Sequence, residues 1–113
     1  MSVSKNKSIN SLPAEWNTND KFLKKEINQI FLKSWLLIGP EDQISNPGDC
    51  LFQSIVDQPI VCVRQEDNSI KTFFNICRHR AGSVKNKKSK NNYLVCKYHG
   101  WTYSINGKLK SPR

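Results

Sequence analysis

The chain has 113 residues, which is enough for one compact domain with a core but not for a second domain of ordinary size. No apolar run approaches the roughly 18 residues that a membrane span requires, and the polar start lacks the apolar segment of a secretory signal. These features argue against a membrane-spanning or secreted protein. We therefore expect a cytoplasmic protein whose four cysteines are thiols or metal ligands and not disulfides.

Charge is distributed unevenly along the sequence, with a formal net charge of +9. All nine acidic residues lie at or before Asp67, whereas residues 68–113 hold eleven Lys and Arg residues. Such asymmetry is typical of a face that binds an anionic partner. A solvated loop explains it equally well, because four of these eleven cations lie within residues 85–90.

The N-terminal part predicts a tail followed by a helix. Residues 1–11 are rich in Ser, Asn and Lys and predict a flexible tail, so the folded domain is expected to span residues 12–113. An amphipathic helix is predicted at about residues 19–33. Asn19 is a suitable cap, and Phe22 and Ile27 belong to an apolar face opposite charged positions.

Beyond the helix, short apolar runs alternate with turn residues, a pattern that predicts the strands of a small antiparallel β domain. The predicted strands are residues 35–38, 50–56, 60–64, 70–76, 93–96 and 101–105. Asn106 and Gly107 predict a hairpin with a type I′ turn, in which both central residues need a positive φ. The predicted fold class is mainly β, with one helix before the strands.

Two Cys and two His residues form the motif that carries chemistry. Cys77 and His79 are followed after sixteen residues by Cys96 and His99, giving the pattern C-x-H-x16-C-x2-H. Structural zinc sites usually pair Cys with Cys and His with His, whereas each pair here is mixed. Mixed pairs suit a centre with two metal ions, and in a Rieske centre two Cys bind one iron and two His bind the other. The spacing favours such a centre over zinc.

Longer segments around these residues carry a family resemblance. Residues 75–82, NICRHRAG, and 95–103, VCKYHGWTY, resemble the N-terminal Rieske domain of ring-hydroxylating oxygenase large subunits, without the catalytic domain of that family. The resemblance covers residues 12–113. It implies a Rieske-type β domain whose cluster lies between two hairpin loops. It also implies one [2Fe-2S] cluster per chain, with Cys77, His79, Cys96 and His99 as cofactor-binding residues and Nδ1 of each histidine as the ligand.

The resemblance also bears on the reduction potential. High-potential respiratory members of the family carry a disulfide across the loops and a Ser that donates to a bridging sulfide. The matching positions here are Gly82, Tyr98 and Trp101, which cannot make those contacts. We therefore expect a potential toward the low end of the Rieske class, about −150 mV.

No residue of this chain is expected to be catalytic. The oxygenases of the family also hold a mononuclear iron on two His and one carboxylate. Both histidines of this chain are already assigned to the cluster, and no carboxylate follows Asp67. The chain is therefore not expected to build an oxygenase active site by itself.

The leading hypothesis is single-electron transfer by a ferredoxin-like carrier, with an electron-donor reductase and an acceptor that presents an acidic surface. The alternative is the Rieske portion of an aromatic-ring or amine hydroxylating oxygenase that needs a separate catalytic chain. A structural zinc module ranks third. A nucleic-acid partner is disfavoured because no aromatic residues interleave with the basic run at residues 85–90, and no membrane partner is expected.

Overall fold

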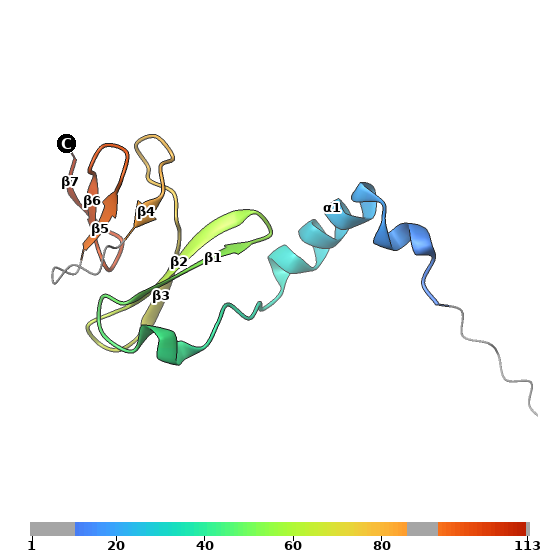
Figure 1. The fold of residues 1–113 in the computed structure, drawn as a ribbon, viewed down its shortest axis with the longest axis horizontal. Helices are drawn as coiled ribbons and strands as arrows, with labels where there is room; N and C mark the ends of the chain where they lie inside the picture. The colour runs from blue at the N-terminus through green and yellow to red at the C-terminus, as the bar shows by residue number, and fades with distance from the viewer. Residues whose placement is uncertain (1–10, 86–92, 113) are drawn as a thin grey trace, which may run out of the picture. The chain divides into compact units, whose positions relative to one another are not determined.

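The computed structural model describes residues 11–85 and 93–112, which fall into two compact units that divide after Leu36. The first unit holds the helix α1, Asp20–Gln29, with a short 3-10 helix on each side, η1 at Ala14–Asn17 and η2 at Phe31–Lys33. The second holds a 3-10 helix, η3 at Glu41–Ile44, and two antiparallel sheets (Figure 1). The predicted fold class is confirmed. The predicted tail and the basic run lie outside the described residues, apart from Ser11 and Lys85.

Helix α1 is the predicted amphipathic helix. The side chain of Asn19 caps it by accepting a hydrogen bond from the backbone N–H of Lys21 at 2.9 Å. The α-helix ends at Gln29, earlier than predicted: Ile30 is its C-cap, with its N–H still bonded to the Glu26 carbonyl, and the next residues tighten into η2. Among the described residues, no helix is long and apolar enough to cross a membrane.

The strand predicted at residues 35–38 is wrong. This segment has no regular secondary structure and pairs with neither sheet. Gly39 and Pro40 follow it directly, and a proline has no N–H to donate and restricts the residue before it. An apolar run of this length therefore served as a connection and not as a strand.

The first sheet is a three-stranded antiparallel meander in the order β1, β2, β3. Its strands are β1 at Cys50–Ile55, β2 at Gln58–Arg64 and β3 at Ile70–Phe74. The central strand β2 is the most buried, and Val61 and Val63 are almost fully inaccessible. This sheet supplies one side of the core.

The second sheet contains the strands β4 at Val84–Lys85, β5 at Tyr93–Cys96, β6 at Thr102–Ser104 and β7 at Leu109–Ser111, paired in chain order. The sequence pattern missed β4, which is only two residues long. Together with the first sheet it forms one core, to which it contributes Val84, Leu94, Tyr103 and Ile105. The Gln65 side chain ties the two sheets together by donating to the carbonyl of Ile105 at 2.9 Å.

The hairpin predicted at Asn106 and Gly107 is present between β6 and β7, but its turn is not type I′. Only Gly107 has a positive φ, +87°, and its N–H donates to the Ser104 carbonyl at 2.8 Å. The pairing of β6 with β7 also contains a bulge. This is the type I turn with a glycine bulge that forms longer hairpin loops.

The tight hairpin turn lies instead between β1 and β2, at Val56 and Asp57. Both have positive φ, 50° and 60°, in a two-residue loop that the pairing of Ile55 with Gln58 closes. A β-branched residue is rare in this region, because its Cβ crowds the backbone. The register of β1 and β2 therefore holds Val56 in a strained conformation.

We expect Val56→Asn to stabilise the domain by about 1 kcal/mol, because asparagine tolerates a positive φ that strains valine. The measurement is the free energy of unfolding by urea titration, read with an unchanged m value. Asn68 provides an internal precedent, since it adopts φ 62° in the turn between β2 and β3. An unchanged or lowered stability would show that the turn carries no such strain.

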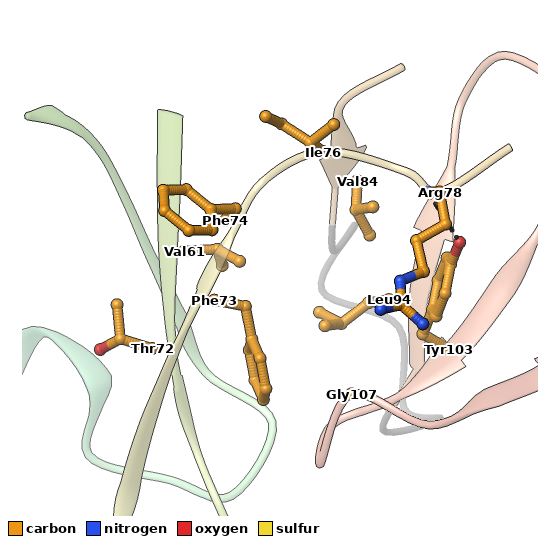
Figure 2. A pocket seen from close by; sticks show the side chains of 10 residues that line it. All are labelled: Val61, Thr72, Phe73, Phe74, Ile76, Arg78, Val84, Leu94, Tyr103 and Gly107. Atoms are coloured by element: carbon orange, nitrogen blue, oxygen red, sulfur yellow. Dashed lines mark hydrogen bonds between the residues drawn. The ribbon is translucent and has the colours of Figure 1, made fainter. Parts of the chain in front are cut away.

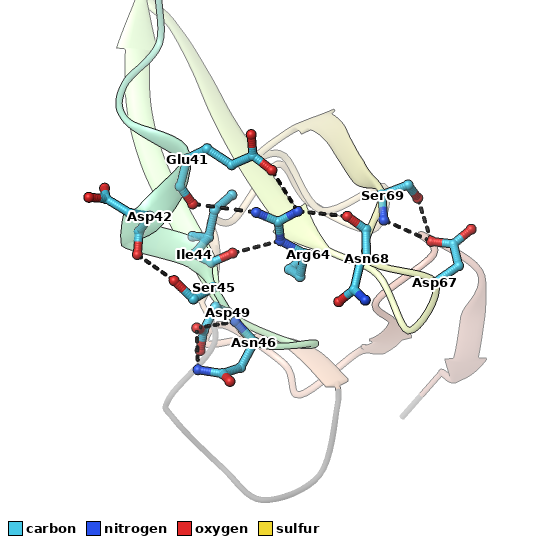
Figure 3. Close-up of polar contacts among 10 residues, drawn as sticks. All are labelled: Glu41, Asp42, Ile44, Ser45, Asn46, Asp49, Arg64, Asp67, Asn68 and Ser69. Atoms are coloured by element: carbon cyan, nitrogen blue, oxygen red, sulfur yellow. Dashed lines mark hydrogen bonds and ion pairs between the residues drawn. The ribbon is translucent and has the colours of Figure 1, made fainter.

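Arg64, the last residue of β2, bonds both to η3 and to the turn between β2 and β3 (Figure 3). This guanidinium is buried, and it donates to the carbonyls of Ile44 at 2.7 Å and Asn68 at 2.6 Å. It also forms an ion pair with Glu41 at 2.9 Å. A buried cation needs such partners, and this set fastens η3 to the turn between β2 and β3.

Candidate metal centre

Two loops at strand ends carry the predicted ligands. The first loop, residues 77–82, lies between β3 and β4, and the second loop, residues 96–101, lies between β5 and β6. In the first loop the N–H of Cys77 donates to the Gly82 carbonyl at 2.8 Å, and the Ala81 N–H donates to the Cys77 carbonyl at 2.9 Å. The loop is thus closed by its own backbone, with Cys77 at its base.

The second loop repeats this hydrogen-bond scheme residue for residue. The Cys96 N–H donates to the Trp101 carbonyl at 2.8 Å, and the Gly100 N–H donates to the Cys96 carbonyl at 2.9 Å. The fifth residue has a positive φ in both loops, 54° at Ala81 and 74° at Gly100. The two cysteines therefore occupy equivalent positions in two similar loops, which is the arrangement that a centre shared between the loops requires.

Strand pairing brings the loops face to face. Val84, just after the first loop, pairs with Cys96 at the start of the second. The approach is closest at Gly82, where a Cβ would lie 3.1 Å from the Cys96 Sγ and 3.2 Å from the Tyr98 Cβ. A side chain at position 82 would therefore crowd both neighbours, which would have to shift by a few tenths of an ångström. The packing role of Gly82 could not be predicted from the sequence, because its neighbours belong to the second loop, which is distant in the chain.

The two thiols are buried in the core. Cys77 is 1% and Cys96 3% exposed. The Tyr103 hydroxyl lies 3.2 Å from the Cys77 Sγ and accepts a hydrogen bond from the Arg78 N–H at 3.3 Å, which leaves its own proton for the sulfur. Sequence reasoning did not assign Tyr103 a role, although its place in the VCKYHGWTY segment was a signal.

Hydrogen bonding favours the thiolate form of Cys77. Burial raises the pKa of this thiol, but donation from the Tyr103 hydroxyl and the His79 backbone, with the neighbouring Cys96 thiol, lowers the pKa below its ordinary value of 9.0. The pKa of Tyr103 is raised, by burial and by its bond to Cys77. Because the thiolate is the metal-binding form, the first loop is prepared for a metal.

The two imidazoles lie next to each other on the exposed side of the loops. The ring centroids of His79 and His99 are 4.8 Å apart, and both side chains are exposed. Trp101 stacks on His79 at 4.8 Å with an angle of 2° between the rings, and Tyr98 covers His99 at 3.9 Å. These aromatic rings restrict how each imidazole can turn. The buried N–H of Trp101 has no hydrogen-bond partner among the described residues.

The chemistry of this donor set fits a Rieske cluster. Such a cluster takes two protein ligands on each iron, two thiolates on one and two imidazoles on the other. The structure brings Cys77 together with Cys96, and His79 together with His99. No three His, Cys, Asp or Glu side chains of the described residues converge on one point as a single-ion site. Cys50 and Cys62 lie on strands away from the loops, and Cys62 contacts Thr72 at 3.2 Å.

We expect Tyr103→Phe to lower the reduction potential by about 50 mV, the electrochemical equivalent of one net hydrogen bond of about 1 kcal/mol. The hydroxyl stabilises electron density on the Cys77 sulfur, so its loss disfavours the reduced state. Protein-film voltammetry measures the shift. Tyr98→Phe is the matched control, because the hydroxyl of Tyr98 makes no hydrogen bond with a described residue. Equal potentials for the two variants would contradict this role.

Comparisons with known proteins agree with this geometry. Residues 34–113 match the family described as the Rieske [2Fe-2S] domain. The alpha subunit of benzene 1,2-dioxygenase from Pseudomonas putida is 40% identical over 93 residues, which are 81% of this chain and 21% of that subunit. The alpha subunit of biphenyl dioxygenase from Paraburkholderia xenovorans is 44% identical over 85 residues, 74% of this chain and 18% of that subunit.

A solved structure shares the fold over most of the chain. The quaternary ammonium Rieske monooxygenase CntA superposes with a TM-score of 0.83 at 28% identity, over 91% of this chain and 30% of that one. This chain belongs to the Rieske [2Fe-2S] domain family, and its cofactor is a Rieske-type [2Fe-2S] cluster. It spans about a fifth of the length of the dioxygenase subunits it matches. The family match begins at residue 34, so the assignment of residues 12–33 to the same domain stays a prediction.

Proposed function

We propose that this domain transfers single electrons through a low-potential Rieske cluster bound by Cys77, His79, Cys96 and His99. The observation that carries the proposal is the pair of equivalent loops, which bury two thiols and present two adjacent imidazoles. When bound, the cluster supplies a reversible one-electron couple. The residues of the chain determine where electrons enter and leave, and at what potential.

The predicted cysteine and histidine ligands differ in burial, so the two sides of the centre differ in their access to a partner. Cys77 and Cys96 lie inside the core, whereas His79 and His99 are exposed. The histidine edge is therefore the part of the centre nearest to a docked protein. Electrons are exchanged at this edge, and the outer nitrogen of each imidazole is available to donate to a partner.

Three positions support a low potential. Gly82 and Tyr98 match the positions of the disulfide cysteines in respiratory members; a Cβ on Gly82 would lie 3.2 Å from the Tyr98 Cβ, and neither residue has a sulfur. Trp101 replaces a serine that would donate to a bridging sulfide. Tyr103 remains as one donor to a thiolate. With fewer donors than a respiratory centre, the potential is expected toward the lower end of the class, about −150 mV.

Exposed cations around the histidine edge support an acidic electron-transfer partner. Arg80 and Lys97 each lie within two residues of a predicted histidine ligand, and both side chains are exposed. No acidic residue follows Asp67 to neutralise them. Opposite charges would accelerate docking at low salt, and the effect would be screened over a Debye length of about 8 Å at physiological ionic strength.

The acceptor we favour is the catalytic domain of an oxygenase, with a reductase system as the donor. Identities of 40% and 44% to dioxygenase alpha subunits support this choice over a free-standing carrier. The relatives include an aromatic-ring oxygenase and a quaternary ammonium oxygenase, so both substrate classes stay open. A ferredoxin-like carrier is the second candidate, favoured by the exposed histidine edge itself.

Electron transfer, and the preference for an acidic partner, can be tested with two redox proteins of opposite charge. Stopped-flow reduction of the holo-domain by an acidic plant-type ferredoxin should slow with rising salt, and oxidation by a basic cytochrome c should accelerate. Arg80→Gln and Lys97→Gln should each slow the first reaction several-fold at low salt, whereas Lys71→Gln on β3 should not. Salt-independent rates with both proteins would refute the docking face, and the absence of a reversible one-electron wave would refute the carrier role.

A further inference from the structure

A hollow of about 520 Å³ opens between the two sheets, on the side of the first loop (Figure 2). Its volume is typical of sites that enclose a compact ligand or a few side chains, about 300–1,000 Å³. Both sheets line it, mostly with apolar side chains. The apolar lining is Val61, Phe73, Phe74, Ile76, Val84 and Leu94.

Two of these apolar side chains are left largely in solvent. Phe74, the last residue of β3, is 67% exposed, and Ile76, two residues beyond it, is 42% exposed. Large exposed hydrophobic groups that gather beside a hollow are typical of interaction sites. The rim of the hollow is therefore suited to an apolar side chain from another molecule.

Arg78 supplies the charge of the site. Figure 2 shows its side chain running beside Tyr103 and toward Leu94, into the hollow. Its guanidinium forms no hydrogen bond or ion pair with any described residue. No carboxylate lines the hollow, and none follows Asp67 in the sequence. A guanidinium beside apolar surface favours a carboxylate as its partner, because charge-assisted and bidentate bonds are strongest there.

We propose that this hollow binds a peptide segment of a partner polypeptide in which an acidic side chain stands next to an apolar one. The carboxylate would pair with Arg78, and the apolar side chain would cover Phe74 and Ile76. Charge complementarity identifies the occupant, since Arg78 is the single cation among the described residues that line the hollow, and residues 68–113 contain no acidic residue to pair with it. The site is separate from the histidine edge proposed for electron exchange.

The hollow is directly connected to the first thiol. Arg78 follows Cys77, and its N–H donates to the same Tyr103 hydroxyl that contacts the Cys77 Sγ. Tyr103 itself lines the hollow. A peptide that engages Arg78 would therefore alter the surroundings of the thiolate, so binding should be visible in the cluster spectrum. Only this second readout rests on the proposed function.

The test uses the full chain with its cluster and two synthetic peptides, N-acetyl-Leu-Glu-Phe-amide and its Gln analogue. Methyl NMR of Leu94, Val84 and Ile76 in the oxidised protein should show the Glu peptide binding with a Kd on the order of 1 mM. The Gln peptide should bind about tenfold more weakly, as expected for loss of one charge-assisted bond. Arg78→Gln should remove this difference between the peptides.

Lys110→Gln is the control, since Lys110 is an exposed cation on β7 that does not line the hollow, and this variant should leave peptide binding unchanged. Phe74→Ser should weaken both peptides, and its exposed position makes a folding defect unexpected. The proposal would be overturned if the two peptides bound equally, or if free benzoate bound as tightly as the Glu peptide. It would also be overturned if the Glu peptide shifted none of these methyl signals at concentrations well above about 1 mM. A domain with an intact cluster spectrum and no peptide shifts would overturn this inference alone.

Discussion

Replacing Cys77 or Cys96 with alanine is expected to abolish cluster binding, leaving less than about a twentieth of the visible absorbance of the wild type. In the proposed centre each thiolate would be half of the protein coordination of one iron, and neither loop offers a second sulfur. The measurement is the iron and sulfide content after anaerobic reconstitution, together with the absorbance spectrum. His79→Ala and His99→Ala should likewise lose the cluster.

The remaining cysteines provide the control. Cys50→Ala and Cys62→Ala should retain full iron content, because these residues lie on β1 and β2 away from the loops. Cys62 is nearly as buried as the two predicted ligands, at 4% exposure, so its variant also reports the cost of removing a buried thiol. Cluster loss in a Cys50 or Cys62 variant, with retention in Cys77→Ala, would reverse the ligand assignment.

Replacing Gly82 with valine is expected to reduce cluster occupancy to about a tenth or less and to lower stability by about 1–3 kcal/mol through overpacking. Even a single Cβ at this position would lie 3.1 Å from the Cys96 Sγ and 3.2 Å from the Tyr98 Cβ. The backbone fixes the Tyr98 Cβ, and the metal would fix the sulfur, so neither neighbour can move aside. The loops would have to separate.

Ser83→Val separates this effect from the general effect of a branched residue in the loop. Ser83 is the next residue, and its side chain is exposed. The Ser83 variant should keep both its iron content and its free energy of unfolding. If Gly82→Val bound iron as well as Ser83→Val did, the close contact between the loops would not be needed for the centre.

Much of the centre could be predicted from the sequence because its ligands lie in two short segments. Cys77 with His79, and Cys96 with His99, are near neighbours in the chain, so spacing alone identifies them as pairs. The structure adds how the pairs meet, through the pairing of Val84 with Cys96. Strand β4 is only two residues long, too short for any periodic pattern, and it was therefore not predicted.

The features that sequence reasoning missed depend on contacts between distant residues. Tyr103 reads as one more alternating strand residue until β6 places its hydroxyl against Cys77. Arg78 reads as a surface cation until the gap between the sheets appears beside it. The turn at Val56 and Asp57 has no glycine or asparagine, so local propensity could not reveal it. Strand pairing overrides local preference at this turn.

The most direct test of the central claim is pulsed EPR of the dithionite-reduced full chain. We predict a red-brown protein with the low average g value of a Rieske centre and with couplings from two imidazole nitrogens. One of these couplings should disappear in each of the His79 and His99 variants that retains any metal. A colourless protein that binds one zinc ion, or a cluster without nitrogen couplings, would contradict it.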